Sequence, residues 1–372
     1  MRLAPFKIER WFARYEFAVD LVLCGSDSES VAVRDILALE PDAESRLHEL
    51  WLGYTESAGS PALRREIARL YTTIAPEHVL VHAGAEEAIL LFMHAALEPG
   101  DHAVVHSPCY QSLAEVARGV GCEVTPWLAR EEARWAPDLD ELRRLLRPAT
   151  RVVVVNTPHN PTGYHMEADD MRALQRMLDE RGIILFSDEV YRESEYVPAD
   201  RLPAACDESE RAVSLGVVSK TYGLPGLRIG WVATRNGAIL ERMAQLKDYS
   251  TICNAAPSEL LSEIALRHRE RLASRNAGII AANLALLDAF FARQREHMRW
   301  VRPRAGPIAF PRLVTGDVND FCDALVRAAS VLLLPGTVYD DGGNHFRIGF
   351  GRRNMPEGLA RVEDFMRGRF GP

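Results

Sequence analysis

Residues 217–231 read Val-Val-Ser-Lys-Thr-Tyr-Gly-Leu-Pro-Gly-Leu-Arg-Ile-Gly-Trp. A first apolar run ends just before Lys220, glycines and a proline then break the backbone, and a second apolar run begins at Ile229. This pattern predicts two buried strands joined by a loop. Desolvation at the end of a buried strand lowers the pKa of an amine, which makes Lys220 a candidate nucleophile. Arg228, which the loop presents, suits an anionic phosphate.

The same residues allow two other interpretations. A surface lysine in an ordinary turn has the same local sequence, so other parts of the chain must decide. A nucleotide-binding P-loop is excluded, because that motif requires Gly directly before the lysine and another Gly five residues earlier. This chain has Ser219 and Ser214 at those positions.

Composition limits the classes of function. The chain has 372 residues, 47% of them hydrophobic, and a formal net charge of −8. This length suits one large domain with a smaller one. The acidic balance argues against a nucleic-acid partner, which requires a basic surplus.

Cysteine spacing and hydropathy indicate the compartment. The six cysteines are scattered without a Cys-x-x-Cys pair, which is typical of a reducing compartment and predicts no metal site. No apolar run approaches the roughly 20 residues that span a bilayer, and the amino terminus lacks the apolar core of a signal peptide. We therefore expect a cytoplasmic protein without a membrane partner.

Strand and helix patterns alternate through the first two thirds of the chain. Buried strands are predicted at residues 79–82, 103–106, 122–126, 152–155, 183–186 and 212–218. Continuous β-branched runs that alternate with helices indicate a parallel sheet covered on both faces. Beyond Trp231 a long helical segment, 258–293, precedes short strands mixed with helices, which predicts a smaller α+β domain.

Polar or glycine residues follow the ends of the predicted strands. They are Gly84, Tyr110, Asn160, Asp188 and Lys220. Ligands of parallel sheets bind at the carboxyl ends of the strands, so this shared placement predicts a single site. The turn at 84–86 also opens a helix, whose free N–H groups and dipole suit an anion.

Several motifs occur together along the chain. In their identity and their order the chain resembles the class I/II aminotransferases of fold type I, which use pyridoxal 5′-phosphate (PLP). The motifs are Gly53-Tyr54 with Gly59 and Pro61, Asn160-Pro161-Thr162-Gly163, Ser187-Asp188-Glu189-Val190-Tyr191, Ser219-Lys220 through Arg228-Ile229-Gly230, and Phe346-Arg347-Ile348. The resemblance covers nearly the whole chain. It implies an α/β fold whose large domain has a mostly parallel seven-stranded sheet between helices, with a smaller α+β domain.

The domain boundaries follow from the same comparison. We expect an amino-terminal arm and part of the small domain in residues 1–45, and the large PLP-binding domain in 46–255. Residues 256–372 are expected to form an interdomain helix and the carboxyl-terminal small domain.

The resemblance implies roles for the residues around the cofactor ring. Lys220 carries PLP as a Schiff base and then moves protons, and Asp188 keeps the pyridine nitrogen protonated. Tyr191 and Asn160 hydrogen-bond the phenolic oxygen. Tyr110 stacks on the ring, although a tyrosine of the core is the alternative for that position.

The resemblance also implies two anion sites. The phosphate is held by the backbone of Gly84, Ala85 and Glu86, by Ser219 and Arg228, and by Tyr54 of the partner subunit, which makes the active unit a homodimer. The α-carboxylate of the substrate forms a bidentate pair with Arg347, with help from Gly25 and Asn160.

Two departures from the family pattern concern the phosphate and the substrate. Val217 occupies a position where the family often has a phosphate-binding serine. The phosphate is therefore expected either to be held by fewer side chains or to be bound by Ser219 or Thr221 instead. No arginine matches the one that reads the distal acid of a dicarboxylate. We therefore hypothesise that Asp27 or Glu29 faces a polar or cationic substrate side chain, the alternative being a solvated loop.

The expected function is an aminotransferase that moves an amino group between an α-amino acid and a 2-keto acid. A PLP-dependent lyase or cyclase is the alternative, since the amino-terminal region resembles capreomycidine-synthase-like enzymes and the cofactor residues would be the same. An aminotransferase-like sensor domain of a transcription regulator is disfavoured, because the sequence has no winged-helix pattern.

Overall fold

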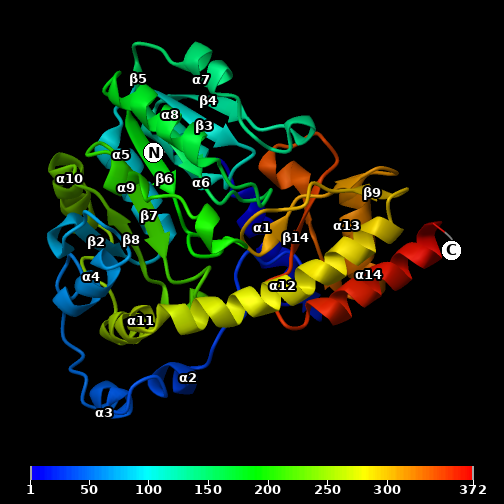
Figure 1. Ribbon diagram of the computed structural model, residues 1–372, viewed down its shortest axis with the longest axis horizontal. Helices are drawn as coiled ribbons and strands as arrows, with labels where there is room; N and C mark the ends of the chain where they lie inside the picture. The colour runs from blue at the N-terminus through cyan, green and yellow to red at the C-terminus, as the bar shows by residue number, and fades with distance from the viewer. Residues whose placement is uncertain (1, 371–372) are drawn as a thin grey trace.

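A mixed sheet forms the centre of the larger part of the molecule (Figure 1), and the computed structural model of the chain describes residues 2–370. Its strand order is β2-β8-β7-β6-β5-β3-β4. The strands are β2 (Val79–His82), β3 (His102–Ser107), β4 (Glu123–Leu128), β5 (Thr150–Asn156), β6 (Ile184–Asp188), β7 (Val213–Val217) and β8 (Gly230–Ala233). Strand β8 is antiparallel to both neighbours and the other pairs are parallel. The predicted mostly parallel seven-stranded sheet is confirmed.

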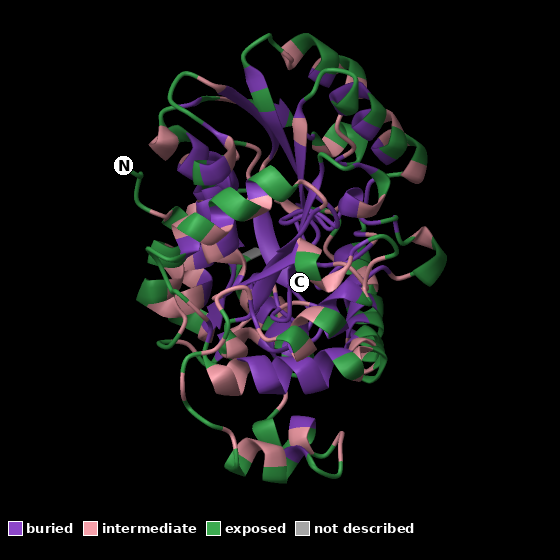
Figure 2. Cartoon of the chain, turned by 90° about the vertical axis from the view of Figure 1, so that its left-hand side faces the viewer, coloured by how far each residue is buried: buried purple, intermediate pink, exposed green. Residues whose placement is uncertain are grey.

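Helices cover both faces of this sheet, as continuous apolar strands require. One face packs against α5 (Ala85–Ala96), α6 (Ser112–Val120) and α10 (Gly237–Lys247), and the other against α7 (Leu139–Leu145), α8 (Ala168–Asp179) and α9 (Ala205–Glu208). Figure 2 shows the strands buried between helices whose outer faces are exposed. The carboxyl ends of β5, β6 and β7 therefore lie side by side at one edge of the sheet.

The long helical segment predicted at 258–293 is interrupted, which corrects the sequence interpretation. Helix α11 (Ala256–Arg267) ends at His268, whose backbone is not helical, and α12 (Arg269–Arg293) begins directly after it. The break lets the two helices pack into different hydrophobic cores. Helix α11 packs with α4 (Pro61–Ala68) on the large part, whereas α12 buries Leu284 and its apolar neighbours in the smaller part.

The smaller part combines both ends of the chain. Its remaining elements are β1 (Leu21–Val22), β9 (Met298–Arg299), β10 (Ile308–Ala309), β11 (Arg312–Leu313), α13 (Val318–Ala329), β12 (Val331–Leu332), β13 (Leu334–Pro335), β14 (Phe346–Gly349) and α14 (Met355–Phe370). Strand β1 pairs in parallel with β12, which ties the amino-terminal segment to the carboxyl-terminal elements. The domain boundaries at 45 and 255 stay predictions.

The amino-terminal arm packs on the body of the protein. In α1 (Lys7–Tyr15), Ile8 is buried and the Trp11 indole donates a hydrogen bond to the Leu333 carbonyl (3.2 Å). Phe6 packs against Tyr110, with 5.0 Å between ring centroids. This arrangement places α1 over the carboxyl edge of the sheet. Helices α2 (Val33–Leu37) and α3 (Ala43–His48) then lead to the large part.

No helix among residues 2–370 is both long enough and apolar enough to cross a membrane.

Candidate active site

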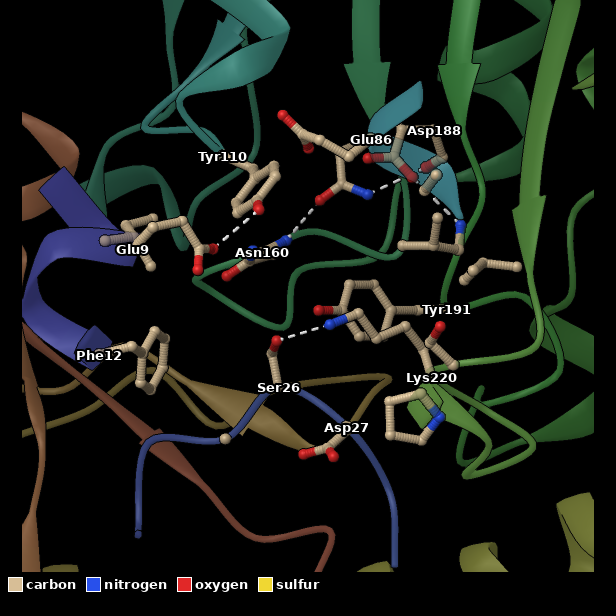
Figure 3. A pocket seen from close by; sticks show the side chains of 18 of the residues that line it. Glu9, Phe12, Ser26, Asp27, Glu86, Tyr110, Asn160, Asp188, Tyr191 and Lys220 are labelled. Carbon is tan, nitrogen blue, oxygen red and sulfur yellow. Dashed lines mark hydrogen bonds between the residues drawn. The ribbon is translucent and has the colours of Figure 1, made fainter. Parts of the chain in front are cut away.

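A cavity of about 430 Å³ lies at the carboxyl ends of β5, β6 and β7, beneath α1 (Figure 3). It brings together most of the residues that the sequence singled out. These are Gly25, Ala85, Glu86, Tyr110, Asn160, Asp188, Tyr191, Ser219, Lys220, Arg228 and Arg347. Four of the five strand-end residues, Tyr110, Asn160, Asp188 and Lys220, line this one cavity, and their roles stay predictions.

Two predicted residues do not line the cavity. Gly84 lies just outside it with φ +89°, and a Cβ there would lie 2.5 Å from Nη2 of Arg228. Glycine is therefore what lets the guanidinium approach the turn before α5. Tyr54 is 85% exposed and is not among the residues that line this cavity.

Lys220 is the lysine of the cavity. The sequence contains three lysines. Lys7 is exposed and forms an ion pair with Asp340, and Lys247 is buried elsewhere, where its amine donates to the Ser57 carbonyl. The Lys220 amine donates a hydrogen bond to Ser26 Oγ (2.9 Å), and burial lowers its pKa. A less basic amine is neutral, and so nucleophilic, in a larger share of molecules.

Asp188 is a buried carboxylate at the end of β6. Its Oδ1 accepts a hydrogen bond from the Val190 amide (3.2 Å), and within residues 2–370 it forms no ion pair. Burial raises its pKa to about 7. A cation placed beside Asp188 would favour the ionised carboxylate, so the site suits a protonated ring nitrogen.

Asn156, which the sequence interpretation missed, fixes the neighbouring strand ends. Its Nδ2 donates to the Asp188 carbonyl (2.9 Å), and its Oδ1 accepts from the Asn160 amide (2.6 Å). One side chain therefore aligns the loop after β5 with the end of β6. Asn156 directly follows four consecutive valines, Val152–Val155. A polar residue at the end of such an apolar strand is the sequence signal by which it could have been recognised.

Arg347, on β14, is buried and bound to neutral groups. Its Nε and Nη2 donate to the Cys24 carbonyl (3.0 and 2.6 Å), and its Nη1 donates to Asn160 Oδ1 (3.1 Å) and to the Tyr339 hydroxyl (2.6 Å). Four of its five N–H groups are thus used. A buried cation with only neutral partners favours an incoming anion, but the predicted bidentate pair requires one of these hydrogen bonds to be exchanged.

Asp27 and Glu29, the two acidic residues hypothesised to face the substrate side chain, lie in different places. Asp27 lines the cavity and forms an ion pair with Arg352, with Nη2 2.9 and 3.0 Å from the two carboxylate oxygens. Glu29 lies outside the cavity, because its amide donates to the Gly351 carbonyl and its Oε2 accepts from the Arg353 amide. Only Asp27 remains available to face a substrate.

Helix α1 adds two acidic side chains that the sequence interpretation did not place there. Glu9 accepts a hydrogen bond from the Tyr110 hydroxyl (3.1 Å). Glu16, the residue that follows the last residue of α1, also lines the cavity. Burial raises the pKa of Glu16, and the Arg352 guanidinium opposes this shift. Nothing in the sequence separates these glutamates from other surface residues of α1, since their position depends on how the helix packs.

The opposite end of the cavity has the features of an anion site. The start of α5 contributes Ala85 and Glu86, and Arg228 lies beside that turn. Ser219 Oγ is buried and has no hydrogen-bond partner among the described residues. Thr221 is committed, since its hydroxyl donates to the Arg192 carbonyl (2.8 Å). Of the two proposed replacements for the missing serine at Val217, only Ser219 is free.

These residues fit PLP. One cavity is lined by an anion site with an unpartnered hydroxyl, by a buried carboxylate that forms no ion pair among the described residues, and by a lysine. The phosphate, ring nitrogen and carbonyl carbon of PLP are groups that these three would bind. Tyr110 and Val190 also line the cavity, as an aromatic ring requires of its surroundings.

Comparison with known proteins agrees with this geometry. Residues 24–362 match the family described as aminotransferase class I and II. The chain is 30% identical over 365 residues to capreomycidine synthase of Streptomyces vinaceus, covering 96% of this chain and 92% of that protein. It is 28% identical over 346 residues to an aspartate aminotransferase of Pyrococcus horikoshii, covering 88% and 86%.

Solved structures extend the comparison to the fold. A PLP-dependent aminotransferase from Streptococcus suis superposes with a TM-score of 0.93 at 32% identity, covering 99% of both chains. The PLP-dependent cyclase OrfR superposes with a TM-score of 0.90 at 31% identity, covering 99% of this chain and 98% of the other. The chain therefore belongs to the aminotransferase class I and II family, whose members of known structure compared above depend on PLP.

Proposed function

We propose that the protein is a PLP-dependent aminotransferase that moves an amino group between an α-amino acid and a 2-keto acid. The observation that carries this proposal is the placement of Lys220 in one cavity with a buried carboxylate, Asp188, and a buried guanidinium, Arg347. These three groups correspond to the needs of the reaction: a nucleophile and base, a partner for the ring nitrogen, and a ligand for the carboxylate of the amino acid.

The cofactor residues keep the roles that the family resemblance implies. PLP, when bound, supplies the electron sink that stabilises negative charge at the Cα of the substrate. Asp188 would hold the proton on the ring nitrogen, and Tyr191 and Asn160 would contact the phenolic oxygen. The phosphate would be held by the turn at 84–86, with Ser219 and Arg228.

Lys220 would do two tasks in turn. Its neutral amine, favoured by burial, would bind the carbonyl carbon of the cofactor covalently in the resting enzyme. With the amino acid bound, the same amine would act as the general base that holds and moves the proton of Cα. Arg347, with Gly25 and Asn160, would hold the substrate carboxylate during this transfer.

A PLP-dependent lyase or cyclase is the second candidate. The similarity to capreomycidine synthase and to the cyclase OrfR supports it. Lys220, Asp188 and Arg347 would serve that chemistry equally well, so the two functions differ in their products and not in their cofactor residues.

A half-reaction experiment distinguishes the aminotransferase from the lyase or cyclase. The cofactor-loaded protein is mixed with a panel of amino acids in the absence of keto acid, and cofactor spectrum and products are measured. A transaminase converts its cofactor to the amine form and releases keto acid in equal amount, and added keto acid reverses both. A lyase or cyclase releases product while the cofactor spectrum returns unchanged.

Lys220→Ala removes the nucleophile. We expect loss of the visible absorbance of the lysine-bound cofactor and a fall in kcat of at least about 100-fold, the usual contribution of a general base. Lys7→Ala is the matched control, because Lys7 is exposed, and it is expected to behave as wild type. Retention of the absorbance in Lys220→Ala would show that the cofactor assignment is wrong.

Asp188→Asn tests the buried carboxylate through stability. In the cofactor-free protein the Asp188 pKa of about 7 lies above its ordinary value of 3.8 because of burial. Between these values the unfolded chain has lost a proton that the folded protein keeps. The free energy of unfolding therefore falls as pH rises through this window, by about 1.4 kcal/mol for each unit of pKa.

Asparagine removes this contribution. Urea denaturation at pH 5 and pH 7 is expected to show a smaller loss of stability in Asp188→Asn than in wild type, and the exposed control Asp42→Asn is expected to match wild type. Equal pH dependence in Asp188→Asn and wild type would contradict the assignment. With cofactor and substrate present, kcat of Asp188→Asn is expected to fall strongly because the ring nitrogen loses its partner.

We also propose that the substrate side chain is cationic. Glu9, Glu16 and Asp27 line the cavity near α1, and two guanidiniums lie near the same helix. Arg352 is already paired with Asp27, and Arg347, 5.9 Å from the centre of the Phe12 ring, already donates to the Cys24 carbonyl. Three carboxylates thus face two guanidiniums. This end of the site therefore carries excess negative charge, which favours a positive group and disfavours a second carboxylate.

Arginine and citrulline test this charge directly, because they have nearly the same shape and differ in charge. We expect wild type to prefer arginine in kcat/KM, and Glu16→Gln to reduce the preference several-fold, whereas the exposed control Glu77→Gln leaves it unchanged. Equal use of arginine and citrulline, or a preference for aspartate, would exclude a cationic substrate and leave the aminotransferase proposal standing.

The active unit is proposed to be a homodimer. Two adjoining loops present large exposed apolar side chains, and the Thr55 hydroxyl links the loops by donating to the Asn254 carbonyl (2.9 Å). These side chains are Trp51, Leu52, Tyr54, Tyr249 and Ile252. Apolar groups gathered in this way favour an interface, and a second copy would bring its Tyr54 to the phosphate site.

Hybrid dimers test whether sites are shared. Tyr54→Ala and Lys220→Ala are each expected to impair activity, and a mixture refolded together is expected to regain up to about one quarter of wild-type activity, since one site of the hybrid combines an intact Lys220 with an intact Tyr54 of the partner subunit. No recovery in a mixture that forms dimers would mean that Tyr54 acts within its own subunit or not at all.

A further inference from the structure

The Tyr339 hydroxyl connects two groups of the site. Tyr339 ends the short helix η5 (Gly336–Tyr339) and is buried behind the cavity. Its hydroxyl donates to Asn160 Oδ1 (3.0 Å) and accepts from Arg347 Nη1 (2.6 Å). The same Nη1 also donates to Asn160 Oδ1 (3.1 Å), so the three side chains form a closed hydrogen-bonded unit.

The fold determines where this hydroxyl lies. Strands β13 and β14 pair with Leu334 opposite Arg347, and the Gly336 amide donates to the His345 carbonyl (2.6 Å). The turn that follows β13 therefore returns over β14. The Tyr339 ring packs edge-on against Phe310, with 5.8 Å between centroids. The hydroxyl is thus held by a strand pair and a core aromatic residue.

The phenol can serve only as a neutral group. Burial raises the pKa of Tyr339 to about 12, so it keeps its single proton at neutral pH. That proton goes to Asn160 Oδ1, which leaves the phenol oxygen to accept from Arg347. Arg347 only donates, so the amide of Asn160 must present its oxygen to this unit. Its Nδ2 donor is then left for the cavity that Asn160 lines.

The unit also determines which N–H groups of Arg347 a ligand can use. Both hydrogens of Nη1 are taken by Asn160 and Tyr339, and the remaining hydrogen bonds go to the Cys24 carbonyl. An incoming carboxylate therefore meets the Nη2 side of the guanidinium. Without the phenol, Nη1 would carry a buried N–H without a partner, and the guanidinium would lose its fixed orientation.

We propose that Tyr339 is a positioning residue of the amino-acid site, holding Arg347 and Asn160 in one unit so that the carboxylate ligand and the amide facing the cofactor are oriented together. The inference rests on the proposed function, since it concerns how that site reads an α-carboxylate. A purely structural Tyr339 would contribute ring packing against Phe310 and nothing to carboxylate recognition.

Tyr339→Phe separates these two roles, because it keeps the ring and removes the hydroxyl. We expect the affinity of the cofactor-loaded protein for propionate, a carboxylate without an amine, to fall about tenfold, as for a lost hydrogen bond to a charged group. Propionate binding is measured by its shift of Tm. With substrates, KM is expected to rise by a similar factor with kcat changed less, and the preference for an amino acid over the matching primary amine is expected to fall.

Tyr196→Phe is the matched control. It also removes a tyrosine hydroxyl, that of a half-buried residue, which donates to the Gly306 carbonyl (2.8 Å); neither Tyr196 nor Gly306 lines the cavity. It is expected to leave propionate affinity and the amino acid to amine preference unchanged. Should Tyr339→Phe not fold, Tyr339→Met fills a similar volume without a hydroxyl and is expected to show the same tenfold loss.

Different results would contradict the positioning role of Tyr339 and the aminotransferase function. If Tyr339→Phe lowers Tm but binds propionate as wild type does, Tyr339 only packs and the inference is overturned. If wild type converts no amino acid to keto acid, the aminotransferase proposal fails, and the propionate measurement still decides whether Tyr339 positions a carboxylate ligand.

Discussion

The burial of charged groups at the carboxyl edge of the sheet is the constraint on which the site depends. Asp188 and Arg347 are almost completely buried, and neither forms an ion pair with another described side chain. Buried charges that lack counter-ions are costly for a folded protein. Burial raises the pKa of Asp188 to about 7 and leaves Arg347 with neutral partners. A ligand that brings a ring cation to Asp188 and a carboxylate to Arg347 would therefore favour the ionised Asp188 and give each buried charge a partner.

The two ends of the chain complete the site that the central sheet begins. The sheet supplies Asp188 and Lys220, but the covering side chains come from α1 and from the loop after β1, which pairs with β12. Arg347 comes from β14. The end of the cavity proposed for the cofactor is therefore built by the large part of the molecule, and the end proposed for the substrate is built by the smaller part together with the amino-terminal arm. Substrate choice can change there without disturbing the cofactor residues.

The sequence predicted those features whose cause is local. Runs of β-branched residues indicate buried strands wherever they occur, and the turn at 84–86 marks a helix start, so the sheet and its ligand-binding edge could be placed. The break at His268 could not be predicted, because the apolar pattern continues through it while the partners of the two helices differ. Glu16 and Tyr339 were missed because only tertiary packing brings Glu16 to the cavity and the Tyr339 hydroxyl to Asn160 and Arg347. The sequence could not choose between Asp27 and Glu29, because hydrogen bonds between Glu29 and the distant backbone of Gly351 and Arg353 accompany its place outside the cavity.

The assignment of Lys220 as the residue that carries the cofactor is the central claim, and a chain with three lysines allows it to be tested by direct mapping. The PLP-loaded protein is reduced with borohydride, digested, and analysed by mass spectrometry. The claim predicts the mass of the reduced cofactor on the peptide that contains Lys220 and on no other. A label on Lys7 or Lys247, or no label at all in protein that has bound PLP, would contradict it.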